Sequence, residues 1–303
     1  MILLKNHLII RSLIIILSVL ALLSGCTEYQ QQNDNSRGSI TDNSVSVSSD
    51  STENQSQKDR LNESEIDTSV FDFYCAKEET AENRIYFNYP LFKETADDAE
   101  ELNEVIEEFV VSTLQKTHQG DFKGNLRDTP EDWKWDNSSY TLLAMKIDYK
   151  IMRNDSDYFS VTFEGLFNVK TAAHPLNEFY SLTIDKKTLR QVTLSDFYRI
   201  DIDFAELVRK EFQEQVRAGL AERAGTTIDK VDERVEKELS SLSDESLVKA
   251  LRQANTVDSS GYGFYFYMTD TALGISVSVS HALGDHFEIL IPFEELESFI
   301  VPY

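Results

Sequence analysis

The feature that most constrains the fold is an almost unbroken alternation of apolar and polar residues in the middle of the chain. Phe159, Val161 and Phe163 alternate with polar neighbours, and residues 140–151 form a second strand-like run just before them. A period of two places alternate side chains on opposite faces of a strand, which leaves one face to be buried. The intervening segment 153–157 is rich in residues that favour turns. The pattern therefore predicts long antiparallel strands.

Strand-like and helix-like segments are grouped along the folded part of the chain without an internal repeat. Apolar residues at helical spacing predict amphipathic helices over about 96–116 and 204–216, and a shorter helix after Ser243. The other β-rich runs are 70–74, 84–89, 179–184, 262–268, 273–279 and 285–291. Grouped antiparallel strands favour an α+β fold over a doubly wound sheet. We expect two small α+β domains, mainly antiparallel sheet with packed helices, at 69–136 and 137–303.

The amino-terminal segment has the pattern of an export signal. Basic residues precede an apolar run of 12 residues over 12–23. That is too short to cross a bilayer, which takes about 20 residues, but it fits the roughly 7 to 15 of a secretory signal. The run ends in Leu23-Ser24-Gly25-Cys26, which is similar to the bacterial lipobox. We expect residues 1–25 to be a lipoprotein signal peptide. Cys26 would then carry a lipid anchor at the extracytoplasmic face of the cell membrane; the alternative is a buried apolar helix that ends in cysteine.

A polar segment follows this cysteine. Of the 42 residues in 27–68, 19 are Ser, Asn or Gln, and Tyr29 is the only aromatic residue. Such a segment buries too little apolar surface to offset its ordering entropy. We therefore expect residues 26–68, which include the lipidated cysteine, to form a disordered tether.

The chain is strongly acidic, with 53 Asp and Glu against 29 Lys and Arg and a net charge of −24. This balance argues against nucleic-acid binding, because phosphate neutralisation needs clustered Lys and Arg. About −20 of the charge falls in residues 69–303, so anionic lipids would repel the folded part. The same field would attract a cationic partner. The alternative is that the excess carboxylates only keep an exported domain soluble.

Three histidines of the folded part, His174, His281 and His286, lie near predicted strand ends. Zinc accepts imidazoles together with a carboxylate such as Asp285, but no two histidines stand at i, i+4. Hydrogen-bonded loop histidines are therefore the preferred interpretation, and we predict no metal site. Residues 281–286 are interpreted as a turn in which Gly284 takes unusual backbone angles.

The sequence contains no clear catalytic constellation. The Gly-x-Ser-x-Gly motif is absent. Cys75 follows Phe73 and Tyr74 and is interpreted as a buried strand thiol, not as a nucleophile. Carboxylates are so abundant that no single pair indicates glycoside cleavage. We therefore predict no catalytic residues and no cofactor.

The motif Trp133-Lys134-Trp135 is flanked by polar residues, so its indoles could present a flat surface to a sugar ring or a partner protein. The outward half of the aromatic run 262–267 could do the same. Packing in a core or between domains is the more frequent role of such residues. Our candidate ligand-binding residues are Trp133, Trp135, His174 and His286.

The order of motifs resembles the paired extracytoplasmic domains of RsiV-type anti-sigma factors, which sense lysozyme, and the region before the catalytic domain of PdaC-type peptidoglycan deacetylases. The resemblance rests on Ala173-His174-Pro175 before a strand, Leu194-Ser195-Asp196-Phe197 after it, and the closing run 287–296. Thr171 and Ala172 stand where glycines often precede the histidine. The resemblance implies an exported binding or sensing module with lysozyme or peptidoglycan as its ligand.

The chain shows no sigma-binding segment, membrane-spanning helix or deacetylase domain, which disfavours both anti-sigma signalling and deacetylation. We therefore expect a membrane-anchored lipoprotein that binds its partner at the cell wall without catalysis. The alternative is a wall-directed hydrolase or an accessory subunit of one. A solute-binding receptor fits the lipid anchor but not the antiparallel pattern, because those receptors use repeated βαβ units.

Overall fold

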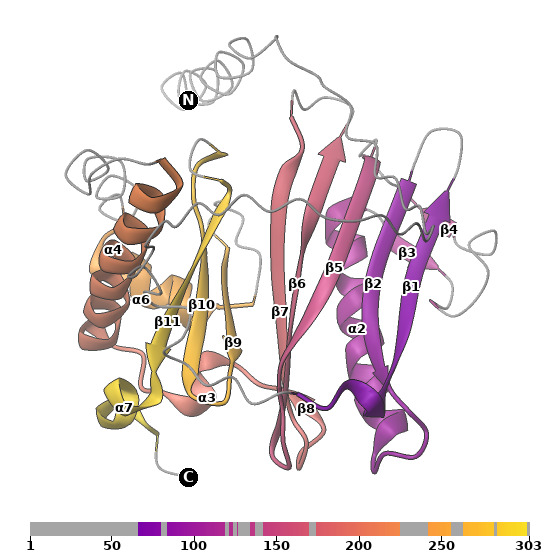
Figure 1. Ribbon diagram of the computed structural model, residues 1–303, viewed down its shortest axis with the longest axis horizontal. Helices are drawn as coiled ribbons and strands as arrows, with labels where there is room; N and C mark the ends of the chain where they lie inside the picture. Colours follow the sequence, from indigo (N-terminus) through magenta and orange to yellow (C-terminus); the bar gives the residue numbers. More distant parts are fainter. Residues whose placement is uncertain are drawn as a thin grey trace, which may run out of the picture. The chain divides into compact units, whose positions relative to one another are not determined.

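The computed structural model describes residues 66–79, 84–118, 121–123, 126, 134–136, 142–169, 174–224, 242–255, 263–281 and 284–301 (Figure 1). All of them belong to one compact unit that spans residues 63–303. The predicted signal peptide, Cys26 and the tether up to residue 65 lie outside the described residues. Within the described ranges, no helix has the length and apolar character needed to cross a membrane.

The larger of the described sheets has six strands. In spatial order they are β1 (Phe71–Glu79), β2 (Arg84–Phe92), β5 (Leu142–Asn154), β6 (Tyr158–Val169), β7 (Leu176–Asp185) and β8 (Arg190–Gln191). Neighbouring strands are antiparallel except β2 and β5, which are parallel. A parallel pair needs a crossover connection. This one contains helix α2 (Ala99–His118) and a small ribbon of β3 (Asp121–Lys123) and β4 (Lys134–Asp136).

Asp155 fixes the turn between the long strands β5 and β6. Its Oδ1 accepts hydrogen bonds from the main-chain N–H groups of Asp157 and Tyr158, both at 2.7 Å, and Arg153 Nε donates to Oδ2 at 2.6 Å. Burial would raise the pKa of Asp155, but these hydrogen bonds and the charge of Arg153 together lower it. The turn predicted from residues 153–157 is confirmed, with Asp155 as the residue that organises it.

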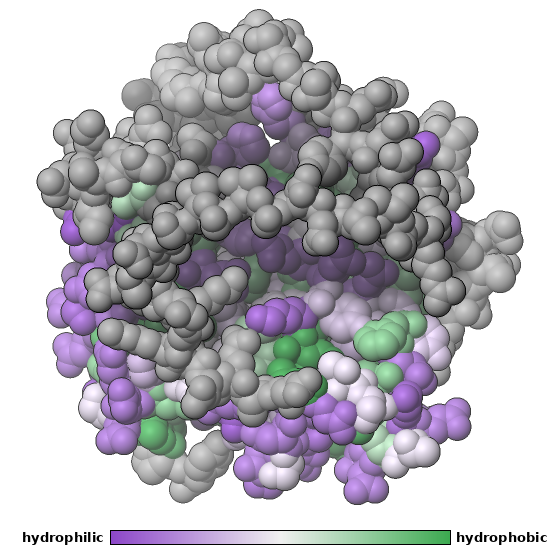
Figure 2. Space-filling model, viewed as in Figure 1, coloured by the Kyte–Doolittle hydropathy of each residue, from purple (hydrophilic) through white to green (hydrophobic). Residues whose placement is uncertain are grey.

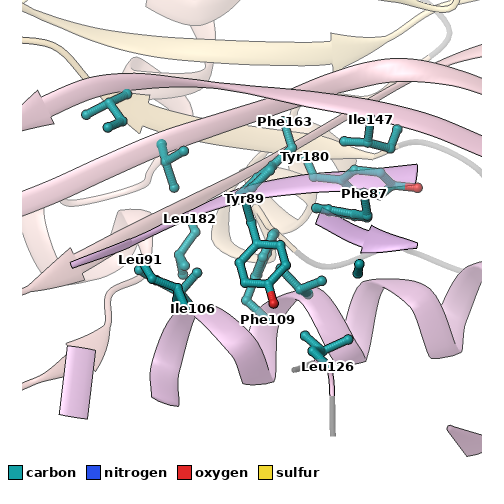
Figure 3. Packing of buried hydrophobic residues seen from close by; sticks show 14 of the residues in the cluster. Phe87, Tyr89, Leu91, Ile106, Phe109, Leu126, Ile147, Phe163, Tyr180 and Leu182 are labelled. Atoms are coloured by element: carbon teal, nitrogen blue, oxygen red, sulfur yellow. The ribbon is translucent and has the colours of Figure 1, made fainter. Parts of the chain in front are cut away.

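Helix α2 packs against one face of the larger sheet (Figure 1). Leu102, Ile106 and Leu114 recur at helical spacing and are buried, as an amphipathic pattern requires. Phe109 stacks on Phe163 of β6 with ring centroids 5.3 Å apart, and both point into the cluster shown in Figure 3. The apolar alternation of β6 is therefore the surface that this helix covers.

The smaller sheet consists of β9 (Phe264–Met268), β10 (Ala272–Ser278) and β11 (His286–Pro292), in the order β11-β10-β9 and all antiparallel. Its helices are α3 (Leu194–Phe197), α4 (Ile202–Ala224), α6 (Asp244–Arg252) and α7 (Phe293–Leu296). Phe204 N donates to the capping Asp201 Oδ1 at 3.1 Å, and Ser246 N donates to the capping Ser243 Oγ at 3.3 Å. These caps begin α4 and α6.

The two faces of the smaller sheet differ because neighbouring residues of a strand point in opposite directions. Leu273, Ile275 and Val277 of β10 join the core formed with α4 and α6. Gly274 and Ser276 therefore face the other way, toward the larger sheet.

The predicted α+β fold is confirmed, with two sheet regions and mostly antiparallel pairing. The hairpin over 70–89 and the helix predicted over 96–116 are also confirmed. The domain boundary between residues 136 and 137 stays a prediction; β2 and β5, from its two sides, pair in one sheet. The interpretation of Cys75 as a buried thiol is wrong: it is exposed, because β1 is an edge strand whose residues 72–75 are all exposed.

Candidate functional site

A groove of about 570 Å³ lies where the larger sheet meets the smaller one. Its lining includes the charged residues Asp148, Lys150, Glu164 and Glu288, and the aromatic residues Tyr149 and Tyr267. We call it the acidic groove, because three of its four charged residues are carboxylates. On the face shown in Figure 2, hydrophilic described residues form a band across the middle, with smaller hydrophobic areas below it.

Tyr267 and Glu288 are paired at the wall of the acidic groove. The hydroxyl of Tyr267 donates a 2.7 Å hydrogen bond to Glu288 Oε2. The Tyr267 ring crosses β10 at Gly274, where a Cβ atom would come 2.2 Å from Cζ of the ring. Because Gly274 has no side chain, the Tyr267 ring can pack directly over the strand at this position. Partial burial raises the pKa of Glu288. The hydrogen bond from Tyr267 lowers this pKa, and the negative charge of Glu164 raises it further.

A smaller pocket of about 250 Å³ shares Asn177 and Phe179 with the acidic groove, and we call it the inner pocket. Glu178 of β7 lies in its wall and accepts a 3.1 Å hydrogen bond from the hydroxyl of Tyr180. Burial raises the pKa of Glu178; the Tyr180 hydrogen bond opposes the rise and the charge of Asp285 reinforces it. Two adjoining sites therefore each hold a carboxyl group that is paired with a tyrosine.

A chain of side-chain contacts leads from His174 to the inner pocket. The rings of His174 and His281 stack with centroids 5.8 Å apart. His281 Nδ1 lies 2.9 Å from Asp285 Oδ1, and Asp285 Oδ2 accepts a 2.8 Å hydrogen bond from the main-chain N–H of Asn177. Gly284 has φ +108°, which confirms its predicted backbone conformation.

His286 lines the inner pocket directly. Its Nε2 lies 3.5 Å from Glu164 Oε1, and its ring centroid lies 5.1 Å from that of Phe179. The structure thus places the candidates His174 and His286 near each other. His286 lines the inner pocket and contacts Glu164 of the acidic groove, and His174 reaches the inner pocket through His281 and Asp285. In the described part of the chain, no three His, Cys, Asp or Glu residues are arranged to hold a metal ion.

The other two candidates are less well placed. Trp133 lies outside the described residues, and Trp135 pairs with Phe122 in the ribbon of β3 and β4 while its side chain is not described. Their part in ligand binding stays a prediction. In the aromatic run, Tyr265 and Tyr267 are buried between the two sheets, where Tyr267 lines the acidic groove and Tyr265 lines the inner pocket.

Sequence reasoning missed Glu178, Ser276 and Glu288. Ser276 and Glu288 sit in strands where polar and apolar residues alternate, which is the ordinary pattern of a strand with one face in water, and Glu178 follows the polar Asn177 at the start of its strand. Nothing in that pattern shows that their polar face meets a second sheet. The three residues line a groove or pocket only because β9 packs against β7. The periodicity of a single strand does not predict that packing.

These features define an α+β protein with two adjoining sheets and a carboxylate-lined groove and pocket where they meet.

No protein-family model matches the sequence, and no curated protein matches it either. Its structural neighbours are DUF3298 family proteins. One, from Pseudomonas aeruginosa, is 11% identical with a TM-score of 0.46, covering 77% of this chain and 93% of that one. Another, from Bacteroides fragilis, is 14% identical with a TM-score of 0.42, covering 77% and 94%. The resemblance to RsiV and PdaC in particular stays a prediction.

Proposed function

We propose that the protein is a lipid-anchored extracytoplasmic module that binds a cationic partner at the cell wall without catalysis. The acidic groove is the observation that supports this most. Asp148, Glu164 and Glu288 line it, against Lys150 as the one basic residue among the described lining. The side chains of Asp148 and Glu164 are 61% and 63% exposed, so a partner can reach them, although Asp148 already lies 3.5 Å from Lys146 Nζ and Glu164 lies 3.5 Å from His286 Nε2.

A cationic protein such as lysozyme is the partner that this charge favours, and peptidoglycan is the second ligand to test. The negative charge of residues 69–303 would speed the encounter with a basic protein. Exposed charges are screened over about 10 Å at 0.1 M salt. Binding through the groove should therefore weaken steeply as salt is added.

The test compares two variants with equal changes in net charge. Both are made in the Cys26→Ser chain, which is purified without lipid. One carries Asp148→Asn, Glu164→Gln and Glu288→Gln in the groove, and the control carries Glu101→Gln, Glu104→Gln and Glu108→Gln on the exposed face of α2. By calorimetry the groove variant should bind lysozyme about tenfold more weakly, while the control loses little. Equal losses, or affinity that ignores salt, would contradict the groove as the binding surface.

A wall-directed hydrolase is the competing function. The observation that favours it is the raised pKa of Glu288 close to Glu164, because a glycosidase pairs a protonated carboxyl group with an ionised one. Incubation with peptidoglycan separates the two functions. Capture without release of sugar supports the binding module, whereas release that is lost in Glu288→Gln supports the hydrolase.

The lipid anchor needs its own test. Metabolic labelling with a fatty-acid probe in a bacterial host should mark the chain and recover it with membranes. Cys26→Ser should lose both label and membrane association, and Cys75→Ser should keep both. Recovery of unlabelled wild-type protein from the cytosol would reject the proposed location.

A further inference from the structure

The inner pocket contains a buried hydroxyl group without a hydrogen-bond partner. Ser276 lies in β10, is 1% exposed, and its Oγ has no partner among the described residues. A buried polar group that stays unpaired is costly, and such groups in folded proteins call for an explanation. Because Ser276 lines the pocket, a ligand seated there would supply the missing partner.

The inner pocket also carries two carboxyl groups. Glu178 and Asp285 both line it, and neither Lys nor Arg is present in its described lining. Glu178 accepts its hydrogen bond from Tyr180, which leaves further acceptor positions on a carboxylate open. Asp285 is held by Asn177 and His281, so it acts on the pocket mainly through its charge.

The walls of the pocket are aromatic and apolar. Phe179 and Tyr265 are 4% and 6% exposed, with ring centroids 6.1 Å apart, and Leu176 and Val279 complete the apolar lining. Aromatic faces attract cations, and apolar walls favour methylene groups. The volume of about 250 Å³ is below the roughly 300–1,000 Å³ of pockets that hold drug-sized ligands. The ligand is therefore small, with an aliphatic stem and one positive charge.

We propose that the inner pocket binds a primary alkylammonium group, with Glu178 and Ser276 as its hydrogen-bond acceptors and Asp285 as a second negative charge. An ammonium group carries three N–H donors and no acceptor, and the Glu178 carboxylate and the Ser276 hydroxyl can both accept from it. A guanidinium is planar and broader and is best held by a bidentate carboxylate, so it fits this small pocket less well.

Two sources offer this chemistry. One is a lysine side chain of a partner seated on the adjoining acidic groove, and this source rests on the proposed function. The other is a free aliphatic amine. Both place the same ammonium group against Glu178 and Ser276, so the site is first tested with a small probe.

The probe is pentylamine, compared with 1-pentanol by calorimetry on the intact Cys26→Ser chain. Wild-type protein should bind the amine and not the alcohol. Glu178→Gln should weaken amine binding by about tenfold or more, and Ser276→Ala by roughly three- to tenfold, since hydrogen bonds to charged groups are the stronger ones. The matched control Glu108→Gln, on the exposed face of α2, should bind as wild type does.

Ser276→Ala keeps the proposal testable even if Glu178→Gln fails to fold, because it removes a hydroxyl that has no partner. Equal binding of amine and alcohol would overturn the ammonium site, and so would wild-type affinity in Ser276→Ala. The pH dependence adds a second readout. The titratable groups that face Glu178 are Tyr180, Tyr265, Asp285 and His286. Affinity should rise with pH as Glu178 ionises, well below the pKa of an alkylammonium, about 10.4.

Competition then distinguishes the sources. If saturating pentylamine displaces lysozyme, a lysine of the partner fills the pocket. If both bind together, the ligand is a free amine and the ammonium site stands. Pentylamine binding without binding of lysozyme or peptidoglycan would reject the proposed function but not this site. Lysozyme binding without pentylamine binding would reject the ammonium site but not the proposed function.

Discussion

Ser181 Oγ donates a 2.6 Å hydrogen bond to the main-chain carbonyl of Phe266, and this bond joins the two sheets. Ser181 belongs to β7 of the larger sheet, and Phe266 belongs to β9, an edge strand of the smaller one. Ser160 of β6 makes the complementary contact, because its Oγ accepts a 3.0 Å hydrogen bond from Met268 N. Hydroxyl groups of the larger sheet thus form hydrogen bonds with main-chain groups of the edge strand β9. These bonds protect that edge from pairing with another chain.

Removal of the Ser181 hydroxyl should weaken the docking of the two sheets. In Ser181→Ala the buried carbonyl of Phe266 loses this donor, and such a loss costs about 1–3 kcal/mol. Urea unfolding followed by circular dichroism measures the change. Ser298→Ala, at an exposed position, is the control and should stay within about 0.5 kcal/mol of wild type. Equal stability of the two variants would show that the hydrogen bond adds nothing.

Two glycines should respond in opposite ways to the same substitution. Gly274→Ala forces the Tyr267 ring away from β10 and should destabilise the protein by about 1–3 kcal/mol, as overpacking does. Gly219→Ala lies in α4, where a Cβ meets nothing within 4 Å, and should stabilise it by about 0.5–1 kcal/mol through helix propensity. Thermal unfolding of both variants checks the signs. A neutral Gly274→Ala would mean that the ring finds another position at no cost.

The elements of this fold could be predicted from the sequence because each one buries a single face. The alternation of apolar and polar residues around Phe163 predicts strand β6. The helical spacing of Leu102, Ile106 and Leu114 predicts helix α2, which covers that strand. Ser243 marked the start of α6 because a serine before an apolar run caps a helix. These are local patterns, and local physics fixes them.

The pairing of elements and the candidate site could not be predicted in the same way. The parallel contact of β2 with β5 depends on where the crossover returns, which the pattern of neither strand records. Glu178 and Ser276 read as ordinary outward-facing residues until a second sheet covers them. The prediction that Cys75 is buried is wrong because aromatic neighbours in a strand do not by themselves indicate burial: Phe73 of the edge strand β1 is 69% exposed.

Glu178 should make the folded protein less stable as pH rises. Its pKa in the folded state is raised above the ordinary value of 4.5, chiefly by burial, so the folded chain holds this proton more tightly than the unfolded chain does. The stabilisation is complete below pH 4.5 and is lost as pH rises through the raised pKa. The stability of Glu178→Gln relative to wild type should therefore increase between about pH 4 and pH 8.

Asp155 provides a control of opposite sign for that experiment. Its pKa is lowered in the folded state, so its stabilisation is present above the ordinary value of 3.8 and is lost as pH falls through the lowered pKa. Asp155→Asn should lose stability relative to wild type as pH rises over the lower part of the range. Urea midpoints at a series of pH values measure both variants. The same trend in both would show that neither carboxyl group is responsible.

Cys75 should react slowly with iodoacetamide although it is exposed. Partial burial raises the pKa of its thiol above 9.0, the charge of Lys77 opposes the rise, and the charge of Asp148 adds to it. The thiolate is the reactive form, so the alkylation rate of the Cys26→Ser chain, which holds no other cysteine, should still be climbing above pH 9.0. Lys77→Gln should move the midpoint of the rate profile upward and Asp148→Asn should move it downward. A midpoint below 9.0, or shifts of the opposite sign, would contradict this environment for the thiol.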